Sequence, residues 1–66
     1  MEAEERLHRI VQLIRVMNLR TQEEQILHNA LGHVAVAARR LGLSDLEEWD
    51  LVILILEYMD EMRRRV

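Results

Sequence analysis

The sequence predicts an all-α fold: a three-helix chain, with helices at about 2–18, 22–41 and 45–64, forming a helical bundle completed by homo-oligomerisation. Three stretches repeat apolar residues every three or four positions, the period of a helix with one buried face. The 66 residues include no proline and two glycines, which excludes many-turned β architectures. Cysteine is absent, so no disulfide can strengthen the small core of the single domain expected at 1–66.

The first helix is predicted by one apolar stripe and one polar face. Glu5 and His8 fall on the polar side, opposite the stripe. Asn18 follows the last apolar residue, where a left-handed residue commonly ends a helix. The stripe consists of Ala3, Leu7, Ile10, Ile14 and Met17.

The second helix is predicted to start at a capping box formed by Thr21 and Glu24. It is predicted to end before Gly42, a residue suited to the left-handed conformation. Gly32 lies inside the helix, where glycine costs about 1 kcal/mol relative to alanine. Two explanations remain open for it: close approach of another backbone, or a tolerated surface glycine. The apolar stripe comprises Leu27, Ala30, Val34, Ala37 and Leu41.

The third helix is predicted to start at a second capping box, Ser44 with Glu47. It contains "LVILIL", residues 51–56, whose β-branched and aliphatic residues would also suit a strand. The flanking segments contain no turn signals and the three-four pattern continues through the run, which favours a helix. Six residues bracketed by Asp50 and Glu57 are far fewer than the roughly 20 that cross a membrane.

A helix that is apolar nearly all round needs more neighbours than two helices of one small chain provide. We therefore expect one flank of the third helix to contact a second chain, and a dimer is the favoured assembly. Gly32 is also expected at this interface. In the alternative, helix one covers one side of the third helix and helix two covers the other. The flank consists of Leu46, Trp49, Ile53 and Leu56.

Charge limits the classes of partner. Acidic residues gather near each predicted helix start and arginines near each end, the order that the helix dipole favours. The net charge is −3, which makes nucleic acid an improbable partner. The N-terminal "MEAEERLHR" is acidic and lacks the apolar segment of a secretion signal, so we expect a cytoplasmic protein without a membrane segment.

Five residues are weak metal candidates. Glu5 and His8 match the Glu-x-x-His spacing of di-iron helical bundles. Glu24 and His28 are one helical turn apart, but both pairs point away from the apolar stripes. His33 borders the stripe of the second helix. Because none of these pairs faces a core, we expect no metal and no other cofactor, and any such site would form between chains.

Catalytic groups are equally sparse. There is no cysteine, and the hydroxyls of Thr21 and Ser44 are both expected to cap helices. The sequence also lacks a glycine-rich phosphate loop. We therefore assign no catalytic residue.

The stretch "AARRLGLS", residues 37–44, resembles the first helix and turn of a helix-turn-helix. The resemblance rests on a small residue at Ala38 and a turn glycine at Gly42. It would imply a DNA-binding regulator whose next helix enters the major groove. That next helix begins "SDLEEWD", which places four carboxylates where bases and phosphates would be met.

The sequence has more apolar residues than three helices can bury, and it has no catalytic groups. Together these features predict a small non-catalytic helical interaction protein. It would act as an oligomeric adaptor, an inhibitor or an antitoxin-like regulator through its apolar helix faces, with a protein as its possible partner. The alternative is a small helix-turn-helix DNA-binding regulator. A third hypothesis is an enzyme with a metal- or arginine-dependent site at an oligomer interface.

Overall fold

The computed structural model describes residues 2–65, and in this range it contains three α-helices and no strand. The helices are α1 (Glu2–Met17), α2 (Thr21–Arg40) and α3 (Asp45–Arg64). The all-α, three-helix fold is therefore confirmed, and each boundary lies within one residue of its predicted position. Completion of the bundle by a second copy stays a prediction.

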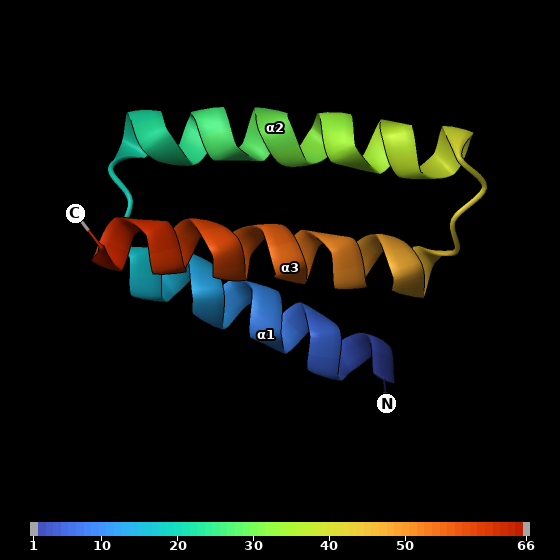
Figure 1. Ribbon diagram of the computed structural model, residues 1–66, viewed down its shortest axis with the longest axis horizontal. Coiled ribbons are helices and arrows are strands. Elements are labelled where there is room, and N and C mark those ends of the chain that lie inside the picture. The colour runs from blue at the N-terminus through green and yellow to red at the C-terminus, as the bar shows by residue number, and fades with distance from the viewer. Residues whose placement is uncertain (1, 66) are drawn as a thin grey trace.

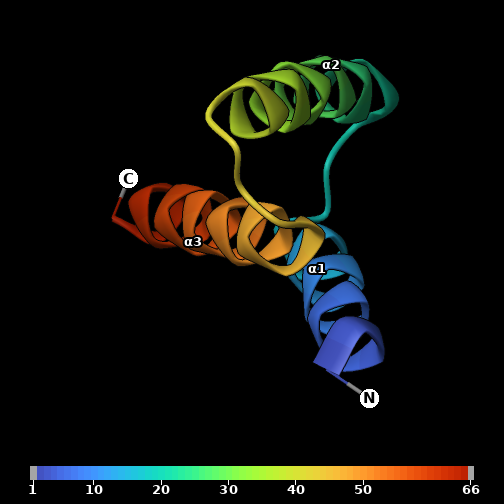
Figure 2. The same cartoon turned by 90° about the vertical axis from the view of Figure 1, so that its right-hand side faces the viewer.

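Helix α3 is the central element and packs against both of the others (Figure 1). α1 and α3 form the more closely packed pair, and they run in the same direction and cross at an angle (Figures 1 and 2). α2 lies across this pair and runs antiparallel to α3. Because α2 packs less closely on α3 than α1 does, the side of the molecule between α2 and α3 is more open.

The start of α2 corrects the predicted cap. The helix begins at Thr21, and Arg20 before it keeps an extended backbone (φ −74°, ψ 160°), which makes Arg20 the N-cap residue. The carboxylate of Glu23 accepts a hydrogen bond from the Arg20 backbone N–H at 2.9 Å. The predicted box of Thr21 and Glu24 is therefore wrong by one residue, since the carboxylate three positions after the cap belongs to Glu23.

The other predicted caps are confirmed. The Glu47 N–H donates to Ser44 Oγ at 3.2 Å, and the Ser44 N–H donates to Glu47 Oε1 at 2.9 Å, which completes the capping box of α3. Asn18 has a φ of 49°, and its N–H donates to the Arg15 carbonyl at the end of α1. These local bonds satisfy backbone groups that each helix end leaves unpaired.

Helix α2 ends in a Schellman motif at Gly42, whose φ is 79°. The Leu43 N–H donates to the Ala38 carbonyl at 3.0 Å, and the Gly42 N–H donates to the Arg39 carbonyl at 3.1 Å. The left-handed conformation explains the glycine, because an L side chain there is strained. The motif reverses the chain and starts α3 antiparallel to α2.

The core is small and is centred on α3. It joins two buried residues of α1 and one of α2 to Val52 and Leu56 of α3, and Leu56 is completely inaccessible to solvent. Half-buried aliphatic residues of all three helices surround this cluster. The buried residues contributed by α1 and α2 are Leu13, Met17 and Leu27.

The "LVILIL" run is covered mainly by its own chain. Val52 and Leu56 lie in the core, whereas Leu54 is 63% exposed. Leu56 was expected on the flank that contacts a second chain, and this assignment is corrected: the helices of the same chain already bury it. The rest of that flank, Leu46, Trp49 and Ile53, is half-buried.

Ion pairs hold α1 against α3 at the surface. The Arg6 guanidinium binds both carboxylate oxygens of Asp50, at 2.7 and 3.2 Å. Arg9, three residues after Arg6 on α1, binds Glu57, seven residues after Asp50 on α3, at 3.1 Å. Exposed pairs of this kind contribute at most about 1 kcal/mol each, so we assign them to orientation of the helices more than to stability.

Candidate interaction surface

An apolar groove lies between the first half of α2 and the second half of α3. Its volume is about 560 Å³. Ile26 and Ala30 line it from α2, and Met59 and Met62 line it from α3. Met17, the last residue of α1, adjoins it. Methionine side chains adapt to differently shaped apolar partners, which suits this groove to protein contact.

One charged side chain stands on each wall of this groove, Glu23 on α2 and Arg63 on α3. Arg63 also donates a hydrogen bond from Nη1 to the backbone carbonyl of Met17. This bond satisfies a carbonyl at the C-terminus of α1, where the helix dipole favours a cation. It also ties the end of α1 to the last turn of α3.

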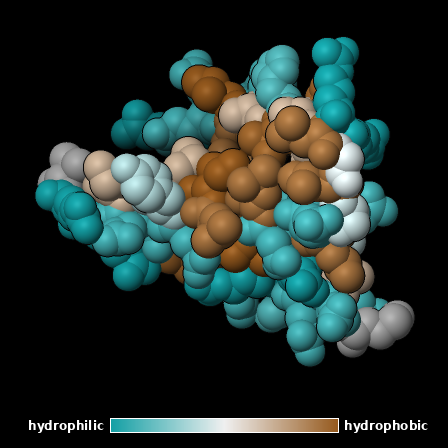
Figure 3. Space-filling model, turned by 45° about the vertical axis from the view of Figure 1, so that its right-hand side comes forward, coloured by the Kyte–Doolittle hydropathy of each residue, from teal (hydrophilic) through white to brown (hydrophobic). Residues whose placement is uncertain are grey.

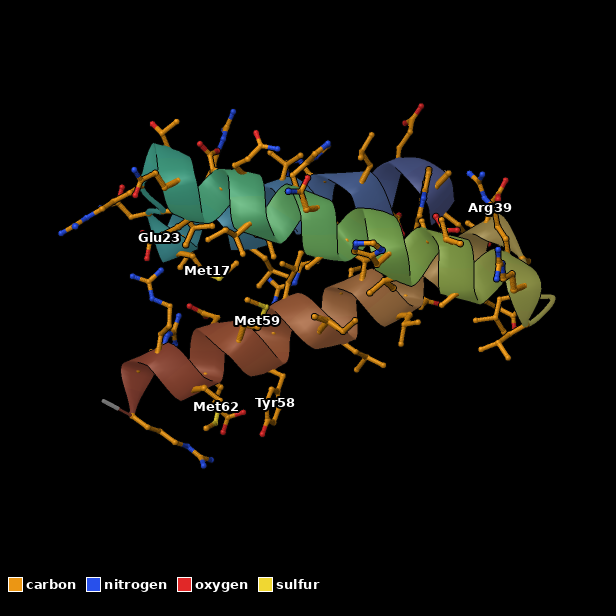
Figure 4. The ribbon with its side chains drawn as sticks, turned by 90° about the horizontal axis from the view of Figure 1, so that it is seen from above. Met17, Glu23, Arg39, Tyr58, Met59 and Met62 are labelled. Carbon is orange, nitrogen blue, oxygen red and sulfur yellow. The ribbon has the colours of Figure 1, made fainter. Side chains whose placement is uncertain are left out.

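A second apolar feature lies beside the groove on the outer side of α3. We call it the outer stripe, and it consists of Leu51, Leu54, Tyr58 and Met62. Tyr58 is 65% exposed. In Figure 4 Met59 points toward α2 and Met17, whereas Tyr58 and Met62 project from the opposite side of α3. Tyr58 and Met62 also line the groove, so the two features are continuous.

The groove and the outer stripe leave several large apolar side chains exposed to solvent. The space-filling view shows hydrophobic side chains gathered in one broad patch with hydrophilic ones around it (Figure 3). Ile26 on α2 and Leu54 and Tyr58 on α3 are among the most exposed large apolar residues. Contiguous apolar patches of this kind typically mark sites of protein association.

Gly32 lies on an exposed part of α2. A Cβ atom built at this position would have nothing within 4 Å apart from its own helix, so close approach within the chain does not explain the glycine. The explanation as a tolerated surface glycine fits the single chain. Its expected place at an interface between chains stays a prediction.

The five weak metal candidates are not brought together. Glu5 and His8 are exposed on α1, and His33 is exposed on α2. Glu24 and His28 line a separate shallow hollow near α1. Across residues 2–65, no group of three or more histidine, cysteine, aspartate or glutamate side chains is arranged to hold a metal ion. The expectation of a protein without a cofactor stays a prediction.

The geometry of α2 and α3 differs from that of a helix-turn-helix. Helices of that motif cross at a steep angle, whereas α2 and α3 run alongside each other in opposite directions (Figure 1). The first turn of α3 is acidic, with Asp45 and Glu47 exposed and Glu48 3.9 Å from Arg39 of α2. The carboxylates of this turn disfavour contact with phosphates.

Two carboxyl groups at the start of α3 have perturbed acidity. Hydrogen bonds from Ser44, first from its backbone N–H and then from its hydroxyl, lower the pKa of Glu47 below its usual value. The hydrogen bond from Arg6, aided by its charge, lowers the pKa of Asp50, and the same contact raises the pKa of Arg6. The folded state therefore favours the ionised form of both carboxyl groups.

We expect the chain to lose stability as the pH falls below about 4, near the unfolded-state pKa values of Asp and Glu. Groups whose pKa is lowered by folding contribute stability that is complete above the unfolded pKa and disappears as the pH falls through the folded pKa. Urea unfolding between pH 7 and pH 2 measures this loss. Asp50→Asn should unfold at lower urea concentration at pH 7 and show a shallower pH dependence, whereas Gln12→Asn, on the exposed face of α1, should keep the full dependence.

Comparisons with protein families, with curated proteins and with solved structures give no match to this chain. Within residues 2–65, none of the helices combines the length and apolar character needed to cross a membrane. The apolar surface and the charges around it are therefore the features of this chain that bear on its function.

Sequence periodicity missed the outer stripe. It assigned Leu56 to the flank that contacts a second chain and left Leu51, Leu54 and Tyr58 outside that flank. One available signal was Tyr58, because its polar hydroxyl favours a position that reaches solvent. The other was the pair of charges, Glu47 and Arg65, which fall on the same side of the helix as Leu54.

Proposed function

We propose that this chain is a small non-catalytic helical interaction protein that works as a homo-oligomer, with a dimer favoured. In this role it would serve as an adaptor, an inhibitor or an antitoxin-like regulator. The observation that carries the proposal is the continuous apolar surface formed by the α2–α3 groove and the outer stripe of α3. An isolated small bundle gains nothing from exposing these side chains to water.

The core of this chain is small. A chain of this length buries too little surface to be strongly stable by itself, and association commonly supplies the remainder. Burying apolar surface contributes roughly 25 cal/mol per Å², so covering Leu54, Tyr58 and Ile26 in an interface would add several kcal/mol before the cost of association. A partner or second copy would thus cover the apolar surface that the three helices leave exposed.

Analytical ultracentrifugation from low to high micromolar concentration tests the proposal. We expect a mass of two chains at the upper end and a concentration-dependent shift toward one chain at the lower end. A chain that stays folded and monomeric throughout would contradict the homo-oligomer. Circular dichroism of the same samples establishes that the chain is helical at each concentration.

A further inference from the structure

We propose that the outer stripe of α3 is the dimer contact, and that it pairs antiparallel with the same stripe of a second copy. This inference rests on the proposed homo-oligomer and adds to it a defined surface, orientation and register. The occupant is a second copy of this chain because Leu54 and Tyr58 at the centre of the stripe, and the charged residues Glu47 and Arg65 beyond it, are complementary to themselves when one helix is reversed. The spacing, the charges and the accessibility of the stripe each support this pairing.

The spacing of the stripe is that of a helix-pairing seam. Leu51, Leu54 and Tyr58 follow one another at intervals of three and four residues. A seam with this alternation meets a second helix along its length with only slight supercoiling. The seam extends to Glu47, four residues before Leu51, and to Arg65, seven residues after Tyr58.

The charges at the two ends of the seam determine its orientation. Glu47 precedes position 56 by nine residues and Arg65 follows it by nine, while Leu54 and Tyr58 lie two residues on either side. A two-fold axis at position 56 therefore places Glu47 opposite Arg65 of the second copy and Leu54 opposite Tyr58. A parallel pair would instead place Glu47 beside Glu47 and Arg65 beside Arg65, which like-charge repulsion disfavours.

Two other sides of α3 face α1 and α2. α1 covers one side, where Asp50 and Glu57 bind its arginines. α2 covers a second side, where Glu48 lies near Arg39. The outer stripe adjoins the groove and faces away from both helices, and Figure 4 shows Tyr58 on it projecting away from α2. A second α3 can thus approach without displacing α1 or α2.

Both terminal charges remain usable in the dimer. Glu47 uses one carboxylate oxygen, Oε1, in the cap of α3, and a carboxylate can accept further hydrogen bonds on its second oxygen. Arg65 binds Glu61 of its own helix at 2.7 Å through Nη2, and its guanidinium has four other N–H donors. Pairing with the second copy would therefore add contacts to both groups without breaking the cap.

Spin-label distances test the orientation, and the absence of cysteine permits labelling at single introduced sites. Glu57→Cys lies one residue from the proposed axis and Arg64→Cys eight residues from it, and both positions avoid the stripe. At 1.5 Å per residue, paired labels are displaced along the helix by about 3 Å at position 57 and about 24 Å at position 64. We expect the label pair at position 64 to be roughly 10–15 Å further apart than the pair at position 57.

A charge placed in the stripe tests the surface itself. Leu54→Glu should raise the dissociation constant of the dimer at least tenfold, because it buries a carboxylate opposite Tyr58 of the second copy. Val16→Glu is the matched control, since Val16 is 60% exposed on α1 and lies outside both the groove and the stripe. The control should leave the dissociation constant unchanged within twofold.

The outcomes separate this inference from the proposed function. A dimer with equal label separations at both positions would overturn the antiparallel pairing. A dimer that Leu54→Glu does not weaken would overturn the outer stripe as its contact, while the homo-oligomer would stand. A monomeric unsubstituted chain without dipolar coupling between labels would contradict both proposals.

Discussion

Replacing Leu56 with alanine is expected to lower the free energy of unfolding by about 2–5 kcal/mol, the usual cost of removing a buried leucine side chain. Leu56 is 0% exposed and is the largest fully buried side chain of the described residues. At roughly 0.05–0.15 kcal/mol per residue, a domain of this size has only about 3–10 kcal/mol of stability. The substitution should therefore unfold a large part of the population near physiological temperature.

Urea unfolding followed by circular dichroism measures this effect, with both variants and the unsubstituted chain at one protein concentration. Leu7→Ala is the matched control, because it makes the same chemical change at a leucine of α1 that is 52% exposed. The control should cost less than about 1 kcal/mol, since a half-exposed side chain leaves no closed cavity. Equal losses from the two variants would contradict the central position of Leu56 in the core.

The sequence was sufficient to predict the helices because their signals are local. The Ser44–Glu47 box, Asn18 and Gly42 each act within a few residues, and all three occur where the pattern placed them. The error at the start of α2 is also local. Glu23 and Glu24 are adjacent carboxylates, and the composition of the segment alone does not determine which of them lies three residues after the cap.

The distribution of burial around α3 could not be predicted in the same way. Periodicity shows that Leu54 and Leu56 lie on different sides of the helix, but it does not show which side α1 and α2 will cover. That choice depends on the crossing of α1 with α3 and on the path of the two short connections. In the structure Leu56 is buried and Leu54 is exposed. The candidate interface is therefore the outer stripe, which contains Leu54, and not the flank that contains Leu56.

The groove depends on tertiary structure as well. Ile26 and Met59 are 33 positions apart in the chain, and they come to line one cavity because α2 folds back antiparallel to α3. The sequence indicated only that there was more apolar surface than three helices could cover. The prediction of a second chain followed from this excess of apolar surface. In the structure, large apolar side chains of α2 and α3 do remain exposed.

On α2, Ala38→Leu should lower the free energy of unfolding by about 1–3 kcal/mol through overpacking. Ala38 is 1% exposed and its carbonyl accepts the Leu43 N–H in the turn that leads to α3. Extra methyl groups at this position must displace either the turn or α3. Urea unfolding at one protein concentration measures the change.

Ala37→Leu is the natural control, because the same atoms are added one residue earlier at an exposed position of α2. A surface change of this kind usually stays within about 0.5 kcal/mol. A difference between the two variants would show that the turn holds the end of α2 firmly against α3. If both variants were as stable as the unsubstituted chain, α2 would have to move away from α3 at little cost, and the groove between them would then have no fixed shape for a partner to recognise.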